Sequence, residues 1–126
     1  MTTTYIKLQD AYVSESNAVG SWKLIGYVAP GSTSASTEGS TTNFAYTAGT
    51  DLTVAGSTLS IENVGTTGKV TWQAKNLVAL NECAVADANK WTITTKAASN
   101  GNSVTYDAAV SDNCRQLTPS YEKIGK

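Results

Sequence analysis

The segment Lys90–Val110, KWTITTKAASNGNSVTYDAAV, contains two stretches of alternating apolar and polar residues separated by a turn sequence, Ser99–Asn102. A period of two is typical of strands that bury one face, and Asn and Gly favour a tight turn between such strands. We therefore predict an antiparallel hairpin that pairs Lys90–Lys96 with Ser103–Val110. Its inward-facing residues are Trp91, Ile93, Val104, Tyr106, Ala108 and Val110.

The two cysteines of the chain, Cys83 and Cys114, flank this hairpin. Pairing of the two strands brings the cysteines to the outer ends of neighbouring strands, where one disulfide can join them. The bond would close a loop of about 32 residues and contribute on the order of 3–4 kcal/mol to stability. A disulfide indicates an oxidising compartment. The alternative, two buried free thiols in a cytosolic protein, remains open.

The chain before the hairpin contains further strand patterns. Alternation predicts a strand at Asn43–Thr47 and a second hairpin that pairs Leu52–Val54 with Leu59–Ile61. In Lys69–Lys75 the inward-facing residues are Val70, Trp72 and Ala74. Pro30–Thr42 consists mostly of Gly, Ser, Thr and Ala, which bury too little apolar area to order a segment strongly, so we predict a surface loop there.

The first twenty residues carry a helical pattern instead. Tyr5, Leu8, Tyr12 and Val19 fall near one face at helical spacing, and Gly20 is placed to end the helix in a left-handed conformation. The pattern predicts an amphipathic helix whose apolar stripe must be covered by the rest of the domain.

Together these patterns predict an α+β fold, in which a long N-terminal amphipathic helix packs on an antiparallel sheet with one disulfide. A chain of 126 residues is long enough for one domain and too short for two. Within this single domain, 1–126, we expect the helix at 1–20, a connecting loop region at 21–50, and the sheet with a disulfide-bounded C-terminal region at 51–126.

The three tryptophans have two interpretations, a hydrophobic core or a sugar-binding platform. Two of them alternate with threonines in predicted strands, where an inward-facing tryptophan normally belongs to the core, so we favour the core. The predicted core consists of Trp22, Phe44, Trp72, Trp91, Ile93, Val104 and Tyr106, packed against Leu8 and Tyr12.

Composition argues against several classes of function. The formal net charge is −1 and no basic cluster is present, so binding to nucleic acid is not expected. The chain contains no histidine, which excludes Ser-His-Asp and Cys-His catalysis and removes the commonest metal ligand. We expect no enzyme, no cofactor and no metal site. A surface rich in Ser, Thr and Gly with few charges favours an extracellular protein.

The order of these elements resembles the soluble head of a type IV pilin. Leu8–Gly20, LQDAYVSESNAVG, resembles the second half of a pilin's long helix, and Gly20–Tyr27, GSWKLIGY, resembles the chain that leaves it. Gly68–Lys75 together with Lys90–Lys96 resembles the central strands, and the region from Cys83 to Cys114 resembles the disulfide-bounded loop near a pilin's C-terminus.

The resemblance implies a structural subunit of a bacterial filament that serves adhesion, motility or surface attachment. In the family, an apolar upstream half of the helix anchors the subunit in the inner membrane and then packs in the filament core. That half is not in this sequence, so we expect an engineered truncation with Met1 as a new start. The resemblance further implies that Tyr5, Leu8 and Tyr12 form a helix face that contacts other pilin subunits. The head alone is expected to be a monomer.

Two alternatives remain. A pseudopilin of a type II secretion system shares the pilin fold, but its head often lacks the C-terminal disulfide, so Cys83 and Cys114 favour a pilin. A secreted carbohydrate-binding β-module would account for the Trp and Thr content, but it would not account for the N-terminal helix.

Overall fold

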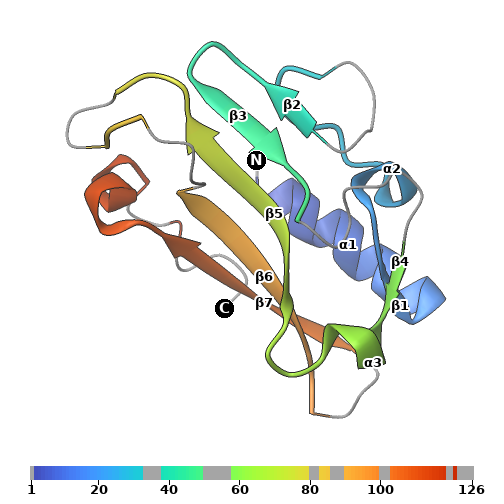
Figure 1. The fold of residues 1–126 in the computed structure, drawn as a ribbon. Helices are drawn as coiled ribbons and strands as arrows, with labels where there is room; N and C mark the ends of the chain where they lie inside the picture. Colours follow the sequence, from blue (N-terminus) through green and yellow to red (C-terminus); the bar gives the residue numbers. More distant parts are fainter. Residues whose placement is uncertain are drawn as a thin grey trace.

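The structure, a computed structural model, describes residues 2–32, 38–49, 58–79, 83–85, 90–99, 103–118 and 121. Figure 1 shows the chain as a ribbon. In chain order the elements are α1 (Thr2–Ser16), β1 (Ala18–Gly20), α2 (Trp22–Ile25), β2 (Glu38–Ser40), β3 (Phe44–Thr47), β4 (Thr58–Ser60), α3 (Ile61–Val64), β5 (Lys69–Asn76), β6 (Trp91–Ala97), β7 (Val104–Val110) and the 3₁₀ helix η2 (Asp112–Leu117).

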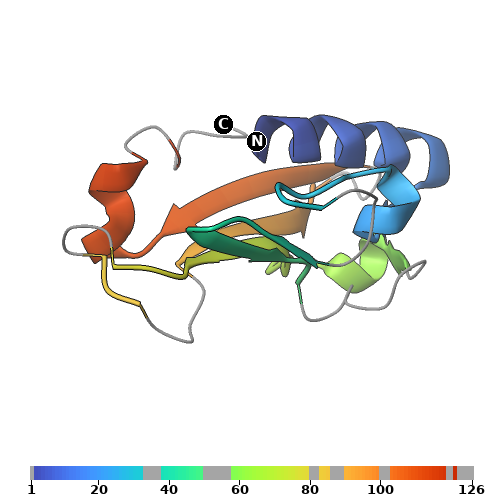
Figure 2. The same cartoon turned by 90° about the horizontal axis from the view of Figure 1, so that it is seen from above.

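Antiparallel sheet dominates the part of the chain that the structure describes. Five strands form the main sheet in the order β2-β3-β5-β6-β7, and β1 pairs with β4 in a separate two-stranded sheet. All pairings are antiparallel. In both views, α1 and α2 lie beside the two-stranded sheet, and η2 lies at the opposite end of the main sheet (Figures 1 and 2).

The predicted hairpin of β6 and β7 is confirmed. The two strands pair over their whole length, from Trp91 opposite Val110 to Ala97 opposite Val104. Val104, Tyr106, Ala108 and Val110 are buried, whereas the residues between them are exposed or half-buried. The alternation in the sequence therefore reports the two faces of the sheet correctly.

The expected fold class, a long helix packed on a sheet, is wrong. The helix α1 is short, with 15 residues, and it packs mainly against β1 and α2, with fewer contacts to β7 of the main sheet. It ends because Asn17 adopts a left-handed conformation, with φ at 54°, while its N–H still bonds the carbonyl of Val13. The next residues, Ala18–Gly20, leave the helix as strand β1.

Gly20 does not end the helix, contrary to the expectation. It lies in β1 and pairs with Thr58 of β4. A Cβ at this position would come within 2.8 Å of the Tyr12 ring, so the glycine permits β1 to approach the helix closely.

Two described segments differ from the predicted loop and the predicted hairpin arm. Part of the loop predicted at Pro30–Thr42 forms β2, an edge strand paired with β3. Thr58–Ser60 pairs with β1, a pairing that was not predicted, and Ile61 begins the short helix α3 instead of ending the predicted strand. The other predicted arm, Leu52–Val54, lies outside the described residues.

The core contains the predicted aromatic residues. All three tryptophans, Ile93, Val104 and Tyr106 are buried, while Phe44, Leu8 and Tyr12 are half-buried and packed against the core. Thr71 differs from its expected outward position, because the register of β5 against β6 shifts between Val70 and Trp72. The shift places Thr71 in the core, where its hydroxyl bonds the hydroxyl of Thr95 at 2.8 Å.

Polar atoms of the core aromatics have partners. The Trp22 indole N–H donates to the carbonyl oxygen of Thr71 at 3.1 Å, and the Trp72 indole N–H donates to the Tyr27 hydroxyl at 3.1 Å. The Trp22 and Tyr27 rings meet edge to face, with centroids 4.8 Å apart. These contacts join the segment around α2 to β5 and let large amphipathic rings be buried without unsatisfied donors.

Replacing Trp72 tests this core. Trp72→Ala should lower the free energy of unfolding by about 3–5 kcal/mol, because it removes a fully buried ring and leaves a cavity. Val85→Ala, at an exposed position, is the control and should change stability by less than about 0.5 kcal/mol. Urea titration followed by circular dichroism measures both. An unchanged Trp72→Ala midpoint would contradict the packing described above.

Candidate interaction surfaces

The described residues contain no group of three His, Cys, Asp or Glu side chains arranged to hold a metal ion. Among the described helices, none is long and apolar enough to cross a membrane. The candidate sites are therefore surfaces: the end of the sheet that carries the disulfide, the predicted helix face, and the edges of the main sheet.

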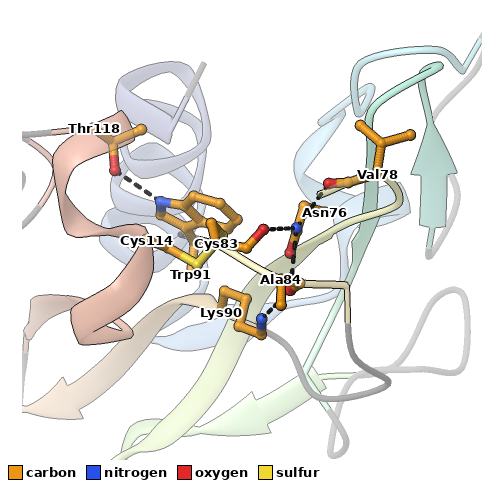
Figure 3. Close-up of a disulfide and its surroundings, with 8 residues drawn as sticks. All are labelled: Asn76, Val78, Cys83, Ala84, Lys90, Trp91, Cys114 and Thr118. Carbon is orange, nitrogen blue, oxygen red and sulfur yellow. Dashed lines mark hydrogen bonds between the residues drawn. A yellow bond between two sulfur atoms is a disulfide. The ribbon is translucent and has the colours of Figure 1, made fainter. Parts of the chain in front are cut away.

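The predicted disulfide between Cys83 and Cys114 is present, with Cα atoms 4.7 Å apart. Both cysteines are fully buried. The bond joins the segment that follows β5 to η2, at the end of the main sheet away from α1 (Figures 1 and 3). It therefore links two segments that are far apart in the sequence, with a separation of 31 residues.

Asn76, the last residue of β5, holds the chain on the Cys83 side of this bond (Figure 3). Its side-chain Nδ2 donates to the carbonyl oxygens of Val78 and Cys83, each at 2.9 Å, and to that of Ala84 at 3.3 Å. The Lys90 Nζ donates to the same Ala84 oxygen at 2.7 Å. The two N–H groups of one buried amide thus serve three carbonyls, so the longest of these contacts, to Ala84, is a shared one.

Trp91 and Thr118 form the corresponding contact on the Cys114 side. The Trp91 indole N–H donates to the Thr118 hydroxyl at 2.7 Å, shortly after the end of η2 (Figure 3). The Tyr121 hydroxyl donates to the carbonyl oxygen of Thr92 at 2.8 Å. Both segments joined by the disulfide are therefore also bonded to the main sheet.

Three of the five large apolar side chains that are exposed among the described residues lie at this disulfide-linked end, whereas Leu24 and Val28 lie in and after α2. Leu77, Val78 and Val85 are 41%, 39% and 53% exposed. The shared bonds of Asn76 to the Val78 and Ala84 carbonyls bring the two stretches together, so we name these three residues the disulfide-end patch. Exposed apolar side chains that a rigid clasp holds in place are typical of a protein contact surface.

The three residues of the predicted subunit-contact face of the helix differ in how far they are buried. Tyr5 is completely buried in the core of this chain, where its ring meets the Tyr27 ring edge to face with centroids 5.4 Å apart. Leu8 and Tyr12 are half-buried. The chain's own packing uses all of the Tyr5 side chain and leaves only parts of Leu8 and Tyr12 accessible.

Gln9 was missed by the sequence analysis. It is fully buried between Tyr5 and Val13 on the inner face of α1. Its Oε1 accepts from the Gly20 N–H at 2.9 Å, while its Nε2 donates to the Gly20 carbonyl at 3.0 Å and to the Tyr5 hydroxyl at 3.1 Å. The spacing Tyr5, Gln9, Val13 is one helical face, and a polar residue inside such a face is the signal that could have identified it.

Burial also governs the ionisation of the tyrosines. Burial raises the pKa of the Tyr5 hydroxyl to about 12, although hydrogen bonds to neighbouring side chains act in the opposite direction. Burial, followed by the hydrogen bond to the Asp10 carboxylate, raises the pKa of Tyr106 above its usual range. The Tyr106 hydroxyl donates to Asp10 Oδ1 at 2.8 Å, which is a contact between β7 and α1. Both hydroxyls stay protonated at neutral pH; that of Tyr5 accepts from Gln9 Nε2, and that of Tyr106 donates to Asp10.

No protein-family model, no curated protein and no solved structure matches this chain.

Reduction of the disulfide is expected to destabilise the native protein. Loss of the Cys83–Cys114 bond should remove about 3 kcal/mol and lower the melting temperature by at least several degrees. Calorimetry with and without a reductant measures the shift, and thiol titration of the native protein should find no reactive thiol. A Cys83→Ser/Cys114→Ser double variant is the control, since reductant should not change its melting temperature. Two reactive thiols in the native protein would contradict the bond.

Alkaline pH should unfold the protein through Tyr5. An unfolded tyrosine ionises near pH 10, whereas the folded Tyr5 resists ionisation until about pH 12, so stability falls as the pH rises through this window. The contribution of Tyr5 is about 2–3 kcal/mol. Urea unfolding at pH 9 to 12 should therefore show a shallower decline for Tyr5→Phe than for the wild type. Equal slopes for Tyr5→Phe and the wild type would be the contrary result.

Proposed function

We propose that this chain is a structural subunit of a bacterial type IV pilus-like filament, without catalysis. The observation that supports it most is the disulfide-linked end, where Cys83–Cys114 and the Asn76 clasp hold exposed apolar residues in a fixed position. A filament subunit needs such contact surfaces to be rigid, because each subunit must present the same surface to its neighbours.

The use of the buried polar side chains supports a structural role. Gln9, Thr71, Asn76 and Thr95 are fully buried, and each makes hydrogen bonds within the fold. Active sites instead hold polar groups ready for a substrate. Except for Asn76 Oδ1, which has no hydrogen-bond partner among the described residues, these buried polar groups join strands, helix and loops.

The partners proposed are other pilin subunits. By the resemblance to pilins, an apolar helical segment preceding the head would anchor the subunit in the inner membrane before assembly and pack in the filament core afterwards. The head would then lie on the filament surface outside the cell. Most of the association energy would come from burial of the apolar segment, since its apolar area is far larger than that of the disulfide-end patch.

The two alternative functions require different structural features. A type II secretion pseudopilin remains the second candidate, and the presence of the disulfide weighs against it. A carbohydrate-binding module would require exposed aromatic rings, but Trp22, Trp72 and Trp91 are all at most 3% exposed and form part of the core. The three tryptophans therefore do not form a sugar-binding platform.

If most of the association energy comes from the upstream segment, residues 1–126 alone should not assemble. At about 10 μM the chain should be a monomer of 13.2 kDa, because the disulfide-end patch has only three apolar residues and contacts much smaller than roughly 1,200 Å² are weak. Light scattering on the purified chain measures its mass. Filaments or a tight oligomer formed by these residues alone would show that the association energy lies in the head.

Immunogold electron microscopy tests the function itself. An antibody raised against residues 1–126 should label filaments on the surface of intact source cells, and cells lacking the gene should show no label. Label confined to the cell envelope would support the pseudopilin instead. Binding of the purified chain to insoluble polysaccharide, without labelled filaments, would support the carbohydrate-binding module.

A further inference from the structure

We propose that a second copy of this chain binds along the free edge of β7, as an antiparallel strand, with Thr105 of each copy opposite Asp107 of the other. The inference is independent of the filament function, since it concerns only the backbone and side chains of β7. β7 is the last strand of the main sheet and forms its lower border in Figure 1.

The direction of the backbone groups follows from the register of β6 and β7. The Ala98 N–H bonds the Ser103 carbonyl, and the Ser111 N–H bonds the Lys90 carbonyl. In an antiparallel pair, hydrogen-bonded positions alternate, so the residues of β7 that bond β6 are the odd-numbered ones. The N–H and C=O groups that point away from the sheet belong to Val104, Tyr106, Ala108 and Val110.

These outward groups have no hydrogen-bond partner among the described residues. Their side chains are buried, so the strand is held rigidly from the inner face of the sheet. The Tyr106 hydroxyl, bonded to Asp10 of α1, adds to this fixation. A preorganised row of donors and acceptors is what a further strand requires.

The two edges of the main sheet differ in how well they are protected. β2 has three residues and carries the charge of Glu38. β7 has seven residues, with no proline, no lysine and no register shift against β6. Short strands, prolines, lysines and bulges are the usual devices against pairing with another chain. β7 lacks all of them, which makes it the edge that accepts a strand.

Side-chain chemistry selects the second copy and its register. A twofold axis relates the two copies in such a pairing. If it passed through position 107, Asp107 would lie opposite Asp107 of the other copy, and like charges directly opposite are unfavourable. With the axis at Tyr106, Thr105 lies opposite Asp107, so each Thr hydroxyl can donate to a carboxylate that also accepts from Lys96 Nζ of its own chain at 3.4 Å. Thr105 and Asp107 both lie on the face of the sheet away from the core. Non-hydrogen-bonded pairs bring such side chains closest.

The backbone completes the match in this register. Tyr106 pairs with Tyr106 of the other copy, and Val104 pairs with Ala108, which gives about six ladder hydrogen bonds. An axis at Ala108 would give Asp107 an alanine neighbour, Ala109, instead of a donor, and would bring the start of the second strand opposite Asp112 in η2. The register centred on Tyr106 therefore satisfies the most groups without opposing charges.

The affinity of this contact is low. Two paired edge strands bury much less than the roughly 1,200 Å² of a stable complex, so dissociation constants near about 1 mM are expected for free chains. This agrees with a monomer at micromolar concentration. The contact gains importance where copies are held close together, because a high effective concentration strengthens weak contacts.

Sedimentation equilibrium on the purified chain from about 10 μM to about 1 mM tests the pairing. The average mass should rise from that of the monomer toward twice the monomer mass. Ala108→Pro should abolish this rise, because proline removes an outward N–H donor without breaking a bond to β6. Ala108→Gly keeps the N–H and is the matched control that should still associate. A wild type that remains monomeric at the highest concentration would overturn the proposal.

Cysteine cross-linking tests the register and does not depend on the proline variant. A mixture of Thr105→Cys and Asp107→Cys chains should form disulfide-linked mixed dimers under mild oxidation, and Asp107→Cys alone should not. The native cysteines are buried in their own bond and do not interfere. Efficient dimerisation of Asp107→Cys alone would place the axis at position 107 and overturn the register proposed here. Surface filaments could still form in that case, so the result would not bear on the filament function.

Discussion

The antiparallel register of β6 and β7 is the constraint on which the rest of the structure depends. It determines which residues of β7 face the core and which face solvent. The same register places Ser111 beside Lys90, so that Cys114 at the start of η2 lies within reach of Cys83. It also directs alternate backbone groups of β7 away from the sheet. A slip by one residue would reverse all of these positions together.

Buried amide side chains hold the segments that strand pairing does not reach. Gln9 bonds both backbone groups of Gly20 and thereby fixes α1 against β1. Asn76 bonds three carbonyls of the chain around Cys83. A buried amide that loses such partners costs on the order of 1–3 kcal/mol, so each clasp favours a single arrangement of its segment. The disulfide-end patch gains its fixed shape from the second of these clasps.

The sequence was sufficient for the features that depend on local patterns. The β6–β7 hairpin and the disulfide were predicted, because strict alternation on both sides of a short turn sets their geometry. The partner of β4 was not, since β1 lies about 40 residues away and three-residue strands carry no pattern that identifies a partner. The end of α1 was misplaced because Asn17, rather than Gly20, adopts the left-handed conformation. Of the predicted contact face, Tyr5 was assigned to a surface although Gln9 and Val13 continue its buried stripe.

Amide hydrogen exchange along β7 tests the central register most directly. At a concentration where the chain is a monomer, the N–H groups of Thr105, Asp107 and Ala109 should exchange slowly, because they bond β6. The N–H groups of Tyr106, Ala108 and Val110 should exchange much faster, since they point away from the sheet. Protection in the opposite alternation, or equal protection at all six positions, would contradict the register and everything derived from it.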